Sequence, residues 1–212
     1  MCRIKELLLP IACFGIFLAG CKEPANHPTV KDSSSPPTTI IPAANRAALI
    51  NLLQALQVRI ASNDKQEIGK LFTFLVPDSL ISLYSTDSAF EAEWTKDGVL
   101  SENVYNKWFS KASEEWQLGE FAKVFTSLDV KELLHKNKLH HDAMVKTEPC
   151  NKTYSIEIDQ DSLVYISYGS NSNDKYKGKV NAEEVYKCEF QTFWTFVFDG
   201  TALRFVRQNG AG

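Results

Sequence analysis

The stretch FWTFVFDGTALRFVR, Phe193 to Arg207, contains the strongest fold signal in the chain. Aromatic and β-branched residues favour strands. Here they flank Asp199-Gly200, a dipeptide typical of two-residue type I′ turns, in which both central residues take positive φ. The stretch therefore predicts a β-hairpin. We expect its return strand to place apolar residues against aromatic ones, with Leu203 and Phe205 beside Phe196 and Trp194.

The strand that enters this hairpin extends further back along the chain. Alternate positions place aromatic and apolar residues on one face, and the opposite face begins polar. The residues on the apolar face are Tyr186, Cys188, Phe190, Trp194, Phe196 and Phe198. Two earlier segments, 154–158 and 163–168, also alternate with period two. Together these segments predict an antiparallel meander with one face packed and one at least partly wet.

The first half of the chain has helical periodicity instead. Apolar residues repeat at three- and four-residue intervals from Leu49 to Ile60, with Asn45 as the expected N-cap. A second stripe runs from Ile68 to Leu75, where Pro77 should end the helix. Further stripes lie at 104–112, capped by Ser101, and at 121–128. The predicted class is α+β, with N-terminal helices packed on a C-terminal antiparallel β-meander.

The order of these elements and the terminal hairpin resemble the nuclear-transport-factor-2-like group of cone-shaped folds, over residues 45–212. In that group a pocket lies between the concave face of the sheet and the helices. The resemblance implies that Tyr186, Trp194 and Phe196 line such a pocket. Some members of the group are enzymes, and many are non-catalytic binding modules.

The beginning of the chain predicts export. Arg3 and Lys5 precede an apolar run from Leu7 to Leu18, which is shorter than the roughly 20 residues of a bilayer-spanning helix. The run ends at Leu18-Ala19-Gly20-Cys21, which resembles the lipobox of bacterial lipoproteins. The resemblance implies that residues 1–20 are a signal peptide and that Cys21 carries a membrane anchor of lipid. A plain signal peptide or a buried amphipathic helix is the alternative.

Residues 21–44 predict a lipidated N-terminus followed by a disordered linker rich in Pro, Ser and Thr. Lys22 stands where an aspartate resembles an inner-membrane retention signal. Its presence therefore favours the outer membrane, on the periplasmic face or the cell surface. Residues 45–212 then form a single globular domain.

The cysteine count supports the same compartment. Cys2 and Cys13 leave with the predicted signal peptide, and Cys21 takes lipid. Cys150 and Cys188 are the remaining pair, and in an exported chain they predict a disulfide. Two buried free thiols are the alternative.

Composition limits the partners. The formal net charge is -3, and no basic stripe suggests nucleic-acid binding. His135, His140, His141 and Asp142 lie together in a segment that predicts a solvated polar connector. A single metal ion would reach two of these histidines only if the segment were a loop. Ser62 with Lys65, and Ser172 with Lys175, match Ser-x-x-Lys, but a chance match explains both. We predict no catalytic residue, metal site or cofactor.

The sequence therefore predicts an envelope lipoprotein whose domain binds a small molecule, a glycan or an envelope protein without chemistry of its own. One alternative is a hydrolase or isomerase that uses the cone pocket. The other is a structural subunit of an envelope complex.

Overall fold

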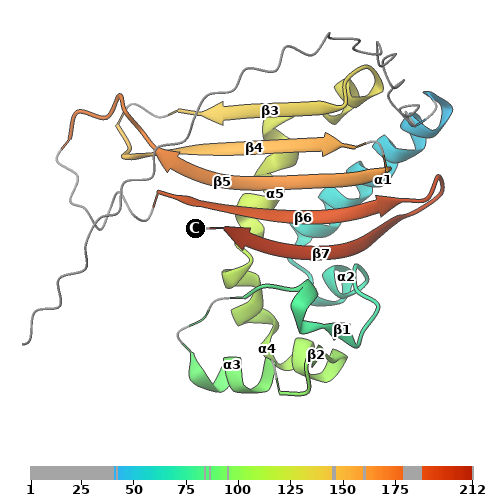
Figure 1. The fold of residues 1–212 in the computed structure, drawn as a ribbon, viewed down its shortest axis with the longest axis vertical. Coiled ribbons are helices and arrows are strands. Elements are labelled where there is room, and N and C mark those ends of the chain that lie inside the picture. Colours follow the sequence, from blue (N-terminus) through green and yellow to red (C-terminus); the bar gives the residue numbers. More distant parts are fainter. Residues whose placement is uncertain are drawn as a thin grey trace, which may run out of the picture. The chain divides into compact units, whose positions relative to one another are not determined.

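The computed structural model describes residues 41, 43–83, 85, 87–94, 96–144, 147–159, 161–178 and 188–211. The predictions for residues 1–40, which include lipidation of Cys21, and those for Tyr186 lie outside these residues. Helices and short strands come first, and a five-stranded antiparallel sheet follows (Figure 1). The predicted α+β class, with its N-terminal helices and C-terminal meander, is confirmed.

The first group of elements comprises α1 (Ala43–Ser62), α2 (Lys65–Gly69), β1 (Val76–Pro77), the 3₁₀ turn η1 (Asp78–Leu80), α3 (Ser88–Trp94), β2 (Val99–Leu100), α4 (Glu102–Glu115), α5 (Leu118–Ser127) and the 3₁₀ turn η2 (Val130–Leu134). The second group comprises β3 (Lys138–Ala143), β4 (Cys150–Ile158), β5 (Leu163–Ser172), β6 (Phe190–Phe198) and β7 (Leu203–Ala211).

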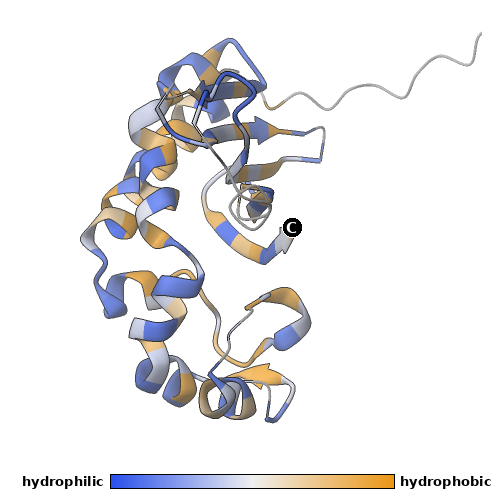
Figure 2. Cartoon of the chain, turned by 90° about the vertical axis from the view of Figure 1, so that its left-hand side faces the viewer, coloured by the Kyte–Doolittle hydropathy of each residue, from blue (hydrophilic) through white to orange (hydrophobic). Residues whose placement is uncertain are grey.

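The sheet has the order β3-β4-β5-β6-β7, so each strand pairs with its neighbour in the chain. Helices cover one face of it (Figures 1 and 2). Helix α5 packs on β4 and β5, while α1 contacts α5, η2 and β7. Helices α3 and α4 and the β1–β2 ladder lie beyond the β7 edge of the sheet (Figure 1).

Helices α1, α4 and α5 form where the apolar stripes predict them. Leu49, Leu53 and Ile60 of α1 are at most 1% exposed, and hydrophilic and hydrophobic residues alternate along the helical layer (Figure 2). Ser101 caps α4 as predicted, because its Oγ accepts a hydrogen bond from the Val104 N–H at 3.3 Å. Burial of these stripes in the core supplies most of the stability that such helices need.

Two helix boundaries differ from the prediction. Helix α1 begins at Ala43, so Asn45 lies inside the helix and is not its N-cap. The helix predicted from Ile68 to Leu75 ends at Gly69. Leu75 takes a φ of 69°, and its N–H donates to the Leu100 carbonyl at 3.1 Å, so the chain enters β1 instead.

The terminal hairpin has the predicted faces and a different turn. Phe205 pairs in register with Phe196, and Leu203 with Phe198, because the loop over residues 199–202 is two residues longer than an Asp-Gly turn; a bulge between Thr195 and Phe196 shifts the register further along. The predicted type I′ turn is wrong, since Gly200 but not Asp199 has positive φ. The Asp199 carboxylate instead accepts hydrogen bonds from the backbone N–H groups of Thr201 and Ala202, which stabilises a longer loop.

A buried arginine fastens α1 to the turn before β3. Arg46 is 7% exposed. Its guanidinium donates to the carbonyls of Ile41, Leu133 and Lys136 and, at 2.6 Å, to Oδ1 of Asn137. Buried polar groups of this kind are costly to leave unpaired, so the set links the first helix to the edge of the sheet.

We expect Arg46→Met to lower the free energy of unfolding by about 3 kcal/mol, because it leaves several oxygens without a donor. Urea denaturation of the purified protein measures this loss. Asn137→Ala, which removes one acceptor, should cost less, and Lys131→Met at an exposed position of η2 should cost almost nothing. Equal losses for Arg46→Met and Lys131→Met would contradict the assigned role of Arg46.

Candidate functional site

The predicted pocket wall is occupied by the core. Trp194 and Phe196 are both 0% exposed. The ring of Trp194 lies 4.8 Å from that of Phe121 and 5.5 Å from that of Trp116, and Phe196 lies 6.1 Å from Phe205. Trp194 and Phe196, which were predicted to line a pocket, therefore pack against other aromatic rings in the core.

The buried tyrosines beside this core are hydrogen-bond donors. Tyr168 donates to the Trp116 carbonyl, and Tyr105 donates to the Lys65 carbonyl at 2.7 Å. Burial raises the pKa of both phenols, and Asp64 raises that of Tyr105 further. Both therefore stay protonated at neutral pH and tie helices to neighbouring backbone.

A polar cluster lies between α5 and β4 at the surface of the helical layer. Glu120 accepts hydrogen bonds from the Tyr154 hydroxyl and the Lys123 ammonium group, both at 2.9 Å. Burial alone would raise the pKa of Glu120, but the hydrogen bonds from Lys123 and Tyr154 outweigh it and lower that pKa. Burial, with a further contribution from Glu120, raises the pKa of Tyr154. The carboxylate is thus held ionised against a protonated phenol.

Beside this cluster lies a polar groove of about 370 Å³, which we call the β3 groove. It runs between the end of α5, η2 and the edge strand β3. Its lining residues are Ser127, Leu128, Asp129, Glu132, Lys136, Lys138, Leu139, His140 and His141. His141 pairs in register with Tyr154, so the Glu120 cluster adjoins the groove.

Most charges along the β3 groove are paired within the chain. Lys136 forms an ion pair with Glu132, and Lys138 forms one with Glu157 across the sheet. His140 Nε2 lies 2.9 Å from Oδ1 of Asp142. The groove therefore has a polar lining whose opposite charges lie close together, which suits a polar ligand or an extended peptide better than an apolar molecule.

Residues 138–143 form the edge strand β3, so the prediction of a polar connector is wrong for this segment. Residues 138–143 pair with β4 in full register, although Leu139 is the single large apolar residue among them. Because successive strand residues point to opposite faces, His140 and His141 lie on opposite sides of the sheet and cannot bind one metal ion together. Within the described ranges, no group of three or more His, Cys, Asp or Glu side chains is placed to hold a metal ion.

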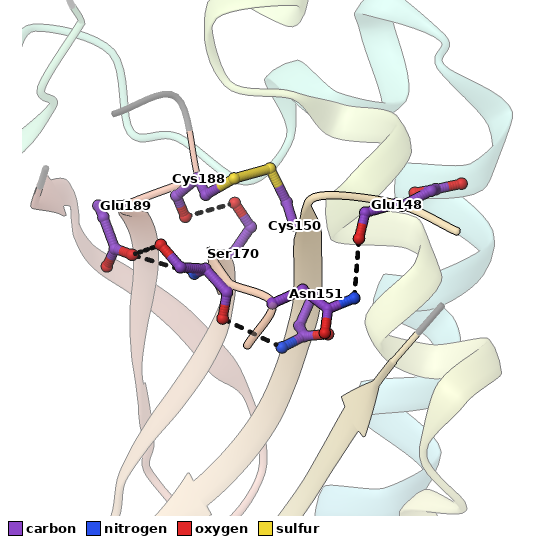
Figure 3. The surroundings of a disulfide bond; sticks show 8 residues. Glu148, Cys150, Asn151, Ser170, Cys188 and Glu189 are labelled. Carbon is purple, nitrogen blue, oxygen red and sulfur yellow. Dashed lines mark hydrogen bonds between the residues drawn. A yellow bond between two sulfur atoms is a disulfide. The ribbon is translucent and has the colours of Figure 1, made fainter. Parts of the chain in front are cut away.

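The other polar concentration surrounds the disulfide (Figure 3). The structure joins Cys150 to Cys188, as the cysteine count predicts. The Ser170 hydroxyl donates to the Cys188 carbonyl at 2.7 Å, and Asn151 donates to the Ser172 carbonyl at 3.3 Å (Figure 3). Glu189 accepts hydrogen bonds from both the N–H and the hydroxyl of Ser172. These side chains satisfy the backbone around the junction, so the cluster has a structural role.

The Ser-x-x-Lys matches also have structural partners. Ser62 donates to the Arg59 carbonyl and accepts from the Asp64 N–H, just before Asp64 caps α2. Ser172 bonds to Glu189 as described above. Neither serine contacts its motif lysine through a described hydrogen bond, which agrees with a chance match.

Comparison with protein-family models, with curated proteins and with solved structures found no match. None of the helices in the described ranges is both long enough and apolar enough to cross a bilayer. The β3 groove and the adjoining Glu120 cluster are therefore identified from their geometry alone.

We expect Glu120→Gln to lower the free energy of unfolding more at pH 7 than at pH 3. The folded pKa of Glu120 is lowered, so its stabilising effect is present above the unfolded value of about 4.3 and is lost as pH falls through the folded value. Urea titrations of both proteins from pH 7 to pH 3 measure the difference. Glu114→Gln, at an exposed site on α4, is the control. A difference that persists unchanged to pH 3 would contradict the assignment.

Proposed function

We propose that this chain is a lipid-anchored protein of a bacterial envelope. Residues 1–20 direct export, Cys21 carries the lipid, and residues 21–44 connect the anchor to the folded domain. The sequence Leu18-Ala19-Gly20-Cys21, at the end of the apolar run from Leu7, supports the anchor.

The observation that carries this proposal is the Cys150–Cys188 disulfide. Disulfides persist in oxidising compartments and are rare where thiols are kept reduced. With these two cysteines paired and Cys2 and Cys13 removed with the signal peptide, Cys21 is the remaining thiol of the mature chain. A free thiol at this position is available for acylation.

We further propose that the domain is a non-catalytic binding module that uses the β3 groove. The aromatic core fills the space beside Trp194 and Phe196, which favours binding at the surface over binding inside the fold. The charged and hydroxylated lining of the groove favours a polar partner, such as a segment of another envelope protein.

Acylation of Cys21 is tested in the full chain, expressed in a bacterial host with an alkyne-labelled fatty acid. The wild type should be labelled and shortened by its signal peptide, and Cys21→Ser should be neither. Cys13→Ser, which alters a cysteine of the same apolar run, should behave as the wild type. Labelling of Cys21→Ser, or no labelling of the wild type, would refute the lipid anchor.

Binding in the β3 groove is tested with a filled variant. Ser127 lines the groove, so Ser127→Trp should abolish any added mass that native mass spectrometry finds on the wild-type protein extracted from membranes. Ser110→Trp, on an exposed position of α4, should retain that mass. The groove is the wrong site if Ser127→Trp retains the added mass, and a wild type without added mass argues against a tightly bound ligand.

A further inference from the structure

The two edges of the sheet differ in what covers them. Along β7, the segment after η1 forms a parallel bridge between Ile81 and Gln208, and the Ser82 N–H donates to the Gln208 carbonyl at 3.1 Å. Along β3, no described strand pairs with the outer edge (Figure 1). An open edge presents unpaired backbone donors and acceptors to another chain.

The β3–β4 ladder determines which backbone groups face outward. The Ile158 N–H donates to the Asn137 carbonyl at 2.7 Å, so residues 137 and 158 form a hydrogen-bonded pair. Such pairs alternate along an antiparallel ladder. Leu139 and His141 therefore direct their backbone groups toward β4, whereas Lys138, His140 and Asp142 direct theirs toward the open edge.

The same three residues share one face of the sheet. Leu139 is buried on the helical side, so Lys138, His140 and Asp142 lie on the opposite face. Lys138 pairs there with Glu157, and His140 contacts Asp142. All six residues of β3 except Leu139 and Ala143 are exposed, so the face is accessible.

We propose that β3 pairs with β3 of a second copy of this chain, antiparallel about a two-fold axis through His140. An isologous contact must be self-complementary, and the outward-facing residues meet this condition in one register. With His140 opposite its own copy, Lys138 lies opposite Asp142 of the partner subunit. Opposite charges directly across a ladder are favourable.

Neighbouring registers bring fewer opposite charges together within the ladder. A two-fold axis at Leu139 places Lys138 opposite His140 of the partner subunit and leaves Asp142 beyond the ladder. An axis at His141 pairs His140 with Asp142 of the partner subunit and leaves Lys138 without a counterpart. Parallel pairing in register places each charge opposite the same charge. Charged residues on an edge strand normally oppose pairing with another chain. The order Lys138, His140, Asp142 therefore favours only the antiparallel register in which Lys138 lies opposite Asp142 of the partner subunit.

A pair of six-residue strands forms a small interface, below the roughly 1,200 Å² typical of stable complexes. We therefore expect weak association, which a covalent trap detects better than sedimentation does. Cα atoms of a hydrogen-bonded antiparallel pair lie about 5.5 Å apart, which is within disulfide range.

The test uses the full chain in bacterial membranes, treated with a mild oxidant and separated on non-reducing gels. His140→Cys should give a linked dimer above the wild-type background. Lys138→Cys alone should not, because its copy lies four residues along the ladder, about 14 Å away. Lys138→Cys expressed together with Asp142→Cys should give the mixed dimer.

No dimer above background from His140→Cys overturns the proposal. Equal linking by Lys138→Cys alone also overturns it, since that result reports random collision. Protease resistance of each variant shows that it is folded. The pairing does not depend on the lipid: acylation is scored separately by fatty-acid labelling, so a failed anchor and a failed dimer give different results.

Discussion

The packing of Trp194 against α5 is the contact on which the rest of the structure depends. Trp194 stands in the middle of β6, and its ring stacks on Phe121 of α5 and meets the edge of Trp116. Trp116 in turn contacts Trp94 and Phe72, which come from separate segments beyond the sheet. One indole thus joins the sheet, the helical layer and the outlying α3–α4 region. Because large aromatic side chains bury the most area per residue, this junction also contributes much of the apolar burial.

Two further links stabilise the fold beyond the aromatic core: a set of hydrogen bonds and a disulfide. Arg46 connects α1 to the turn before β3, and the Cys150–Cys188 disulfide connects the start of β4 to a residue two positions before β6, across the intervening strand β5. A covalent loop of this length stabilises a fold by about 3–4 kcal/mol, mainly through the unfolded state. The disulfide therefore links the two strands that flank β5, while Arg46 holds α1 against the turn that leads into β3.

Much of the architecture could be predicted from the sequence, because it follows from strong periodic patterns. The stripes of α1, α4 and α5, the Ser101 cap, the hairpin faces and the disulfide partners appear as expected, whereas the stripe from Ile68 to Leu75 is helical only as far as Gly69. β3 was missed because a short edge strand needs only Leu139 on its buried side, and its other residues resemble a solvated connector. The turn was wrong because the Asp199 carboxylate stabilises a loop that the Asp-Gly dipeptide does not specify. The groove was beyond prediction, since it arises where α5, η2 and β3 meet in space.

The position of Arg46 also determines how the domain would respond to a pull from the N-terminal side. Tension on the chain before Ile41 enters the fold at the start of α1, where the Ile41 carbonyl is itself bonded to the Arg46 guanidinium. The load passes next through that guanidinium to the carbonyls of Leu133 and Lys136, and so to the root of β3. Helix α1 also contacts α5 and β7, but the hydrogen bonds of Arg46 do not involve the β6–β7 hairpin or the loop closed by the disulfide. Under such a pull, the contact between α1 and η2 would therefore break first. The packing around Trp194 and the loop closed by the disulfide would still be intact.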